Sequence, residues 1–230
     1  DFCLSRGLGD VYKRQVVVLP NIPCGTCWAC QHGLGETVCQ HFNNIGFERA
    51  GGFAEYVSVP QKNILEISKK LDSSIATLAE PMACGLHAIE IARLKEGDNI
   101  LVLGVGPIGL LITFVCSTEY ASNIVACDPS SFRLKVAREL GAMDTIEPED
   151  LKSQDMFPDV VFDCVGGLSQ ITNQIIDVIQ PCGTICIVGF PFGAKPVNFR
   201  RLQFKEVQIK TTQACSFKNL QDAVSIIERY

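Results

Sequence analysis

The sequence predicts an α/β protein in which a parallel sheet is covered by helices on both faces and is preceded by a cysteine-rich segment. Two observations support this prediction. From residue 99 onward, short apolar runs of strand length alternate with longer amphipathic runs of helix length. Before that point, four cysteines lie at metal-ligand spacing within residues 24–39, in a loop rich in proline and glycine.

Composition narrows the class of protein. The chain has 230 residues, of which 47% are hydrophobic and 20% charged, as is ordinary for one large or two modest globular domains. A formal net charge of -5 gives no basic surface for nucleic acid. Proline, glycine or charged residues interrupt each apolar run before membrane-spanning length, and no secretory signal is visible. We therefore expect a cytoplasmic protein with no nucleic-acid or membrane partner.

Twelve cysteines are many for this length, but the long α/β pattern is unlike the small, loop-rich folds that disulfides hold together. Outside the metal-spaced group, and apart from Cys3, the cysteines lie in mostly apolar surroundings. We expect them to be small buried hydrophobic residues, namely Cys84, Cys116, Cys127, Cys164, Cys182, Cys186 and Cys215. This usage favours a reducing cytosol.

Three segments are expected along the chain. Residues 1–15 show no clean periodicity, and we interpret them as non-native sequence from cloning or assembly. Residues 16–75 are expected to form a smaller, β-rich domain, and residues 76–230 the domain of alternating strands and helices. In the smaller domain, a strand at 16–19 leads into the cysteine-rich loop, and residues 53–67 alternate in strand fashion around a proline.

A helical run at 73–93 leads into the larger domain, and Pro81 is expected to force a break or a new start in it. After this run, strands and helices alternate. The predicted strands are 99–103, 123–127, 159–163, 184–188 and 206–211, and the predicted helices are 107–119, 130–140, 168–179 and 217–229.

A glycine-rich motif, G-x-G-x-x-G, follows the first of these strands and opens the next helix, which is the context of a dinucleotide site. Gly104 permits a tight turn, Gly106 lets the backbone approach the pyrophosphate, and Gly109 allows the helix to pack close to the strand. The helix N-terminus presents free N–H groups to the phosphates. The larger domain is therefore predicted to be a Rossmann fold. The motif residues assigned to the cofactor are Gly104, Gly106, Pro107, Ile108 and Gly109.

Asp128 follows the next strand, where a carboxylate can accept hydrogen bonds from both ribose hydroxyls and repels a 2′-phosphate. The cofactor is therefore predicted to be NAD rather than NADP. Arg133, five residues on, has two interpretations. It is either a solvated helix residue or a side chain packed near the adenine or the phosphates.

Two later strand ends are also assigned to the cofactor, because ligands of such sheets lie at the carboxyl ends of strands. Val165 and Gly166 follow one strand, and Val188 and Gly189 follow another. Glycine at these positions lets the backbone pass close to the nicotinamide half. An ordinary turn is the alternative, and Gly167 fits it equally well.

Cys24, Cys27 and Cys30 follow one another at a spacing of three, and Cys39 supplies a fourth thiol in the same loop. Four thiolates can close a tetrahedron around Zn²⁺ with no open position, and such a site is structural rather than catalytic. Free thiols or disulfides are the alternative.

Together these motifs resemble the zinc-containing medium-chain dehydrogenase/reductase family, in particular its sorbitol, threonine and polyol dehydrogenase branch. The resemblance runs from Val16 to Tyr230, and its most specific parts are the four cysteines, the stretches Gly51–Tyr56 and Leu78–Pro81, and the glycine motif with Asp128. It implies a GroES-like catalytic domain at 16–75, two zinc ions, and hydride transfer to NAD from a secondary alcohol or polyol such as sorbitol, idonate or threonine. It also implies a homodimer or homotetramer.

Glu80 matches the glutamate of the family's Glu-Pro pair, which lies at the catalytic zinc as a ligand or near-ligand. The resemblance therefore makes Glu80 a catalytic and metal-binding candidate. In the family, that zinc polarises the substrate hydroxyl so that an alkoxide can release hydride. Many alcohol dehydrogenases have cysteine at this position, so the carboxylate favours the polyol branch. The alternative is an ordinary surface acid at a helix end.

Three departures from the family pattern affect what is expected of this chain. The family's Cys-Gly-Thr/Ser-Asp and Gly-His-Glu stretches are absent, eight rather than seven residues separate Cys30 from Cys39, and the sequence stops in the helix ending at Tyr230. We therefore expect a fragment that is truncated at both ends and inactive by itself. Two alternatives remain: a zinc-stapled nucleotide-binding module without turnover, and a zinc-free quinone reductase relative that prefers NADPH, which the four-cysteine loop disfavours.

Overall fold

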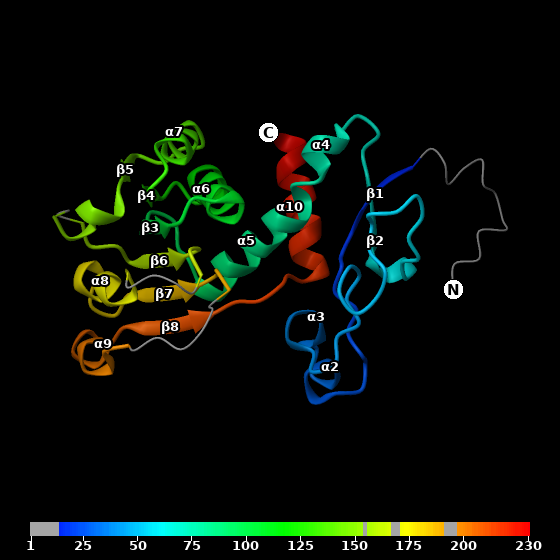
Figure 1. The fold of residues 1–230 in the computed structure, drawn as a ribbon, viewed down its shortest axis with the longest axis horizontal. Helices are drawn as coiled ribbons and strands as arrows, with labels where there is room; N and C mark the ends of the chain where they lie inside the picture. The colour runs from blue at the N-terminus through cyan, green and yellow to red at the C-terminus, as the bar shows by residue number, and fades with distance from the viewer. Residues whose placement is uncertain (1–13, 154–155, 167–170, 191–196) are drawn as a thin grey trace. The chain divides into compact units, whose positions relative to one another are not determined.

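The computed structural model describes residues 14–153, 156–166, 171–190 and 197–230. These residues pack into two compact units (Figure 1). The first unit combines residues 14–87 with 213–230, and the second comprises 88–212. The boundary expected between 16–75 and 76–230 differs from these packing boundaries, and the division into functional domains stays a prediction.

The second unit is built on a six-stranded sheet in which all neighbouring strands are parallel. The strand order is β5-β4-β3-β6-β7-β8, and Figure 1 shows β6, β7 and β8 pointing the same way. The order reverses between β3 and β6, and open parallel sheets bind ligands at such a switch point. The predicted doubly wound α/β fold is confirmed. The bounds are β3 Asn99–Leu103, β4 Asn123–Cys127, β5 Asp144–Ile146, β6 Val160–Asp163, β7 Thr184–Ile187 and β8 Gln208–Thr211.

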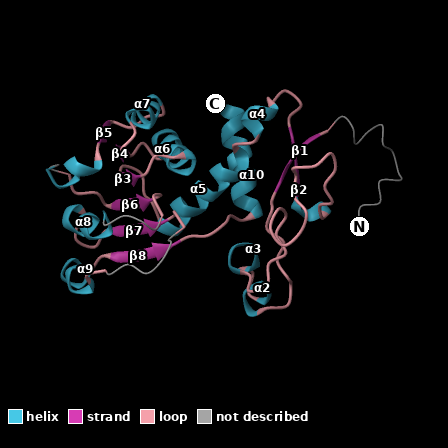
Figure 2. Cartoon of the chain, in the orientation of Figure 1, coloured by secondary structure: helices cyan, strands magenta, loops and turns pink. Residues whose placement is uncertain are grey.

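Helices connect these strands and lie beside the sheet (Figure 2). Pro107 occupies the first position of α6, where its missing N–H costs little. Ser130 caps α7 by accepting a hydrogen bond from the N–H of Arg133, and Asn198 caps α9 by accepting from Arg201. The bounds are α6 Pro107–Glu119, α7 Ser131–Glu139, the 3-10 helix η2 Pro148–Ser153, α8 Ile171–Val178 and α9 Phe199–Lys205.

The centre of this sheet is apolar. All residues of β6, and all residues of β3 except the first, are buried. Strands that helices cover on both faces have such continuous apolar runs. One core cluster joins the strands to α8 and α9, and it includes Leu101, Leu103, Val161, Ile175, Ile179, Ile185 and Leu202.

The first unit contains a two-stranded antiparallel sheet and several short helices, with α10 packed on α4. The Nδ2 of buried Asn63 donates hydrogen bonds to the carbonyls of Leu19 and Asn21, each at 2.8 Å. The Nδ2 of Asn21 donates to the carbonyl of Cys215 at 3.0 Å, which fixes the loop before α10. The bounds are β1 Gln15–Val18, α2 Trp28–Gln31, α3 Gly35–Val38, the 3-10 helix η1 Gln61–Asn63, β2 Ile64–Ile67, α4 Ser73–Ala76 and α10 Phe217–Arg229.

Two expectations for this region need correction. The helical run expected at 73–93 is interrupted at 77–78, between α4 and α5 (Ala79–Ala92), and not at Pro81. Pro81 is the third residue of α5, where the backbone N–H has no partner within the helix and proline is tolerated. Of the strand pattern at 53–67, only β2 forms a strand, because it pairs with the four residues of β1.

The stretch Ser73–Ala92, which takes in α4 and α5, is by length and composition apolar enough to cross a membrane. The expectation that no apolar run reaches this length is therefore wrong, because Pro81 and Gly85 lie within α5 without ending it. In the structure, 44% of the apolar window is buried, and core helices of globular proteins meet the same criterion. The stretch is thus weak evidence for a membrane span.

Candidate functional site

The glycine motif forms the turn between β3 and α6, at the switch point of the sheet. Gly104 has a φ of 78°, and a Cβ atom there would lie 2.8 Å from the Cγ2 of Val165. At Gly109, a Cβ atom would lie 2.1 Å from the carbonyl oxygen of Gly104. Both positions therefore require glycine so that the loop can turn and α6 can pack against it.

Gly106 differs from these two glycines. A Cβ atom there would meet nothing within 4 Å, and its φ of -70° is open to any residue. Free space beside the backbone is what the close approach of a pyrophosphate needs. Gly106 is also the N-cap of the 13-residue helix α6, and it offers no side-chain cap to the first N–H groups. The open N-terminus of α6 favours a bound anion.

Asp128 lies just after β4 and is only 2% exposed. Its Oδ2 accepts a hydrogen bond from the N–H of Val105 in the glycine loop at 3.0 Å, and its Oδ1 accepts from the N–H of Ser130 at 2.9 Å. The Nη1 of Arg133 lies 3.5 Å from Oδ2, and half of the Arg133 side chain is exposed. Asp128 therefore ties the glycine loop to the start of α7. Its remaining lone pairs can still accept ribose hydroxyls.

The segments that follow β6 and β7 pack backbone against backbone. A Cβ atom at Gly166 would lie 2.6 Å from the carbonyl oxygen of Phe190, and one at Gly189 would lie 2.2 Å from the N of Gly166. The N–H groups of Val188 and Gly189 both donate to the carbonyl of Asp163, at 2.8 and 2.9 Å. Glycine is thus needed here for packing, and the contribution of these loops to cofactor binding stays a prediction. Gly167 lies outside the described residues.

The four cysteines of the first unit come together. Their sulfur atoms all lie within 4.8 Å of one another. The Sγ–Sγ distances are 3.8 Å for Cys24–Cys30, 3.4 Å for Cys27–Cys30 and 3.9 Å for Cys27–Cys39. Four sulfurs at about 2.3 Å from a zinc ion in a tetrahedron lie about 3.8 Å apart. These three distances are close to that value, so the four thiols fit a tetrahedral Zn²⁺ site.

Hydrogen bonds from backbone N–H groups stabilise the thiolate form of some of these cysteines. The N–H of Cys24 donates to the Sγ of Cys39 at 3.3 Å, and the N–H of Cys27 donates to the Sγ of Cys24 at 3.4 Å. The hydroxyl and the N–H of Thr26 lower the pKa of Cys24 to about 5. Burial and the thiol of Cys27 raise the pKa of Cys30 to about 12. A bound metal ion would deprotonate all four thiols.

The extra residue in the spacer between Cys30 and Cys39 does not separate Cys39 from the other thiols. The spacer folds into the short helix α3, which begins at buried Gly35. A Cβ atom at Gly35 would lie 2.7 Å from the Sγ of Cys30, so α3 rests directly on the cluster. Glu36 in α3 accepts a hydrogen bond from the N–H of Phe217 at 3.0 Å, which connects the spacer to the start of α10.

A second group of candidate metal ligands lies elsewhere in the first unit. The ligand atoms of Glu80, Cys84 and Cys215 lie within 4.8 Å of one another, and the Sγ of Cys84 donates to the Oε1 of Glu80 at 3.6 Å. The thiol of Cys215 and burial raise the pKa of Cys84 well above its usual range. The sequence pattern identified Glu80 but treated both cysteines as buried hydrophobic residues. The i, i+4 spacing of Glu80 and Cys84 on one helix could have indicated part of this group.

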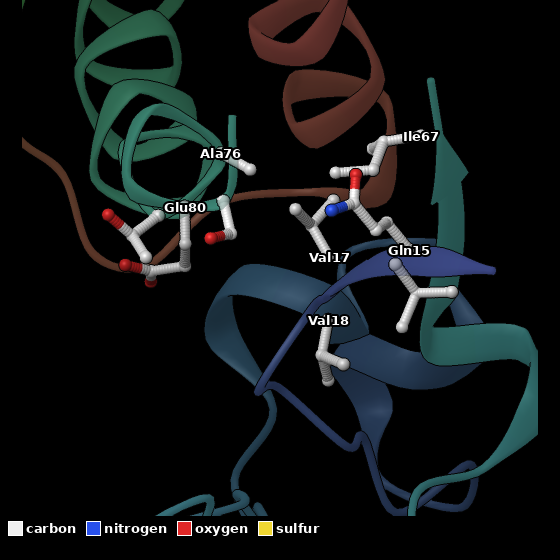
Figure 3. Close-up of a pocket in the computed structure, with 9 residues that line it drawn as sticks. Gln15, Val17, Val18, Ile67, Ala76 and Glu80 are labelled. Atoms are coloured by element: carbon white, nitrogen blue, oxygen red, sulfur yellow. The ribbon is translucent and has the colours of Figure 1, made fainter. Parts of the chain in front are cut away.

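Glu80 also lines a cavity of about 540 Å³ (Figure 3). Its side chain is only partly exposed, lines the cavity and lies close to both thiols. This position is unlike that of a solvated surface acid. The other residues that line the cavity are Gln15, Val16, Val17, Val18, Ile67, Ser73, Ala76 and Thr77.

Two family models match the chain. The model of the zinc-binding dehydrogenases matches residues 107–229, and that of the alcohol dehydrogenase GroES-like domain matches residues 9–69. The second match includes part of the segment 1–15 that was interpreted as non-native, and the origin of that segment stays a prediction.

Curated relatives of the chain are named as dehydrogenases. The chain is 29% identical to galactitol 1-phosphate 5-dehydrogenase of Escherichia coli (strain K12), over 81% of the chain and 56% of that protein. It is 29% identical to L-threonine 3-dehydrogenase of Anaeromyxobacter sp. (strain K), over 83% and 56%. It is 30% identical to D-altritol 5-dehydrogenase of Agrobacterium fabrum, over 93% and 65%. The chain thus spans between about half and two thirds of the length of these relatives.

Solved structures share the fold. An alcohol dehydrogenase from Escherichia coli CFT073 in complex with NADH superposes with a TM-score of 0.87 at 27% identity, over 94% of this chain and 65% of that one. L-idonate 5-dehydrogenase from Escherichia coli gives 0.85 at 27%, over 94% and 64%. A protein from Sinorhizobium meliloti 1021 bound to NADP gives 0.87 at 29%, over 94% and 66%.

Proposed function

Because the chain belongs to the zinc-binding dehydrogenase family, we propose that the protein transfers a hydride from a secondary alcohol or polyol to NAD. The family resemblance drawn from the sequence motifs is thereby confirmed. The activity of the whole protein, its substrate and its partners are proposals.

The observation that carries the choice of cofactor is the buried carboxylate of Asp128 beside the glycine loop. A carboxylate at this place accepts ribose hydroxyls and repels a 2′-phosphate, so it supports NAD. The guanidinium of Arg133 lies beside the Asp128 carboxylate and balances part of its negative charge. It also places a positive charge near the proposed site. Relatives of known structure include one bound to NADH and one bound to NADP, so the preference needs measurement.

Two metal ions are proposed. The loop of Cys24, Cys27, Cys30 and Cys39 would hold a structural Zn²⁺, since four thiols close its coordination sphere. Glu80 would be a ligand or near-ligand of a second zinc ion beside the cavity. A zinc ion bound there supplies a Lewis acid that lowers the pKa of a substrate hydroxyl. The valine side chains of β1 line the same cavity and would contact the apolar part of a bound substrate.

The substrate class rests on the relatives. Galactitol 1-phosphate, threonine and altritol are the substrates in their names, and the numbers in two names place the reaction at carbon 5. We propose a small hydroxylated substrate that is oxidised at an internal carbon. The protein is further proposed to be cytoplasmic and to form a homodimer or homotetramer, as expected from the sequence.

The test is an assay of NAD⁺ reduction by the protein from its complete reading frame, with galactitol 1-phosphate, altritol, idonate and threonine. We expect NADH to form with at least one of them, and a strong chelator to abolish the activity. If the protein binds NADH and retains zinc but oxidises none of them, the proposal is wrong. The alternative, a zinc-stapled nucleotide-binding module without turnover, then stands.

A further inference from the structure

We propose that Glu80, Cys84 and Cys215 together form a metal site for Zn²⁺ or a similar thiophilic divalent cation. The inference rests on the proposed role of Glu80 at a metal, and it adds two thiolate ligands from this chain. It differs from the four-cysteine loop in its ligands and in its place in the fold.

The geometry matches a tetrahedral site with one open position. Zinc binds thiolate sulfur at about 2.3 Å and carboxylate oxygen at about 2.1 Å, so neighbouring ligand atoms lie roughly 3.6 to 3.8 Å apart. The Cys84 Sγ and the Glu80 Oε1 lie 3.6 Å apart, and all three ligand atoms fall within 4.8 Å. Three protein ligands leave the fourth position for a water molecule or a substrate oxygen.

The ligands lie on rigid parts of the first unit. Glu80 and Cys84 are one turn apart on α5, so their side chains share a face of the helix. Cys215 is fully buried and directly precedes Ser216, whose side chain and backbone form a capping box with Asn219. The hydrogen bond from Asn21 to the Cys215 carbonyl holds the same segment. Such fixed ligands lose little freedom when a cation binds.

The ligand set selects the kind of cation. Two thiolates and one carboxylate suit Zn²⁺, and Co²⁺ takes the same ligands, whereas Mg²⁺ and Ca²⁺ prefer oxygen ligands alone. The carboxylate also lines the cavity, so a cation at this site would be next to the space where a small hydroxylated molecule fits. Three protein ligands with an open fourth position next to a cavity are typical of a catalytic rather than a purely structural zinc site.

The experiment measures bound metal in the 230-residue chain and in the variants Cys84→Ala and Cys215→Ala. Cys116→Ala is the matched control, because Cys116 is a buried thiol of the second unit and belongs to neither cluster. We expect about two zinc ions per chain in the wild type and in the control, and about one in each cluster variant. In the Co²⁺-substituted protein, the thiolate-to-cobalt absorption should fall by about a third in the cluster variants, from about six Co–S bonds to about four.

Circular dichroism and NADH binding establish that each variant is folded. The proposal is overturned if the cluster variants keep the metal content and cobalt spectrum of the wild type. It is also overturned if peptide mapping finds Cys84 and Cys215 joined in a disulfide in the zinc-loaded chain. These outcomes are distinct from failure of the proposed function, which is judged by NAD⁺ reduction. If both cluster variants of the 230-residue chain lose metal while the protein from the complete reading frame oxidises no polyol, the result supports this site and contradicts that function.

Discussion

The Asp128 carboxylate accepts a hydrogen bond from the Val105 N–H, and we propose that it also binds the ribose of the cofactor. Asp128→Asn keeps an acceptor oxygen but removes the charge that repels a 2′-phosphate and pairs with Arg133. We expect the ratio of NADH to NADPH affinity to fall about tenfold or more, a change of about 1.4 kcal/mol. Fluorescence titration with both nucleotides measures it.

The control for this substitution is Asp144→Asn. Asp144 lies on β5 of the same sheet and also pairs with an arginine, Arg138, at 3.1 Å, but its side chain is more than half exposed and lies outside the predicted site. The control should keep the wild-type nucleotide preference. An unchanged nucleotide preference in Asp128→Asn would mean that Asp128 only holds the glycine loop in place and does not select the cofactor.

Two glycines of the motif are predicted to have different roles, one in folding and one in cofactor binding, and single substitutions can distinguish them. A Cβ atom at Gly109 would overlap the Gly104 carbonyl, so Gly109→Ala should lower the free energy of unfolding by about 1–3 kcal/mol. Gly106 has open space beside it, so Gly106→Ala should fold with wild-type stability yet bind NADH at least about tenfold more weakly. Urea unfolding and NADH titration distinguish the two. Normal NADH affinity in Gly106→Ala would place the pyrophosphate elsewhere.

At the scale of elements, the zinc loop depends on how closely α3 approaches its thiols. Gly35→Ala adds a methyl group 2.7 Å from the Cys30 sulfur, so the helix or the thiol must move. We expect faster release of zinc to a coloured chelator and a loss of about 1–3 kcal/mol in stability. Gly52→Ala is the control, because a Cβ atom there meets nothing within 4 Å. Equal zinc release from both variants would contradict a packing role for Gly35.

Local chemistry explains which elements could be predicted from the sequence. The bounds of α6 and α10 agree with the sequence patterns, because proline at the first position marks one start and the Ser216 capping box marks the other. The pattern predicts neither β5 nor α9, since three and seven residues are too few to show a period. The strand expected at 206–211 is shorter because Glu206, in the left-handed region, ends α9.

The candidate sites also differ in how far the sequence alone predicts them. The residues of the glycine motif, and likewise the four cysteines, lie close together in sequence, so their spacing was enough to identify them. The partnership of Cys215 with Glu80 and Cys84 depends on how α5 and the loop before α10 fold together, and no local spacing encodes it. The contact of Val165 with Gly104 is equally invisible in sequence, because it joins the ends of two strands that become neighbours only in the sheet.

At the scale of the whole molecule, the two units differ in what stabilises them. Every zinc-loop ligand belongs to the first unit, whereas the apolar cluster around β3 and β6 belongs to the second and includes none of these ligands. Chelation of zinc should therefore increase hydrogen exchange in residues 20–45 and in the β1–β2 pair, while β3 and β6 stay protected and NADH affinity is kept. Mass spectrometry of deuterium uptake, with and without chelator, measures this. A matching loss of protection in β3 and β6 would show that zinc stabilises one cooperative structure that extends through both units.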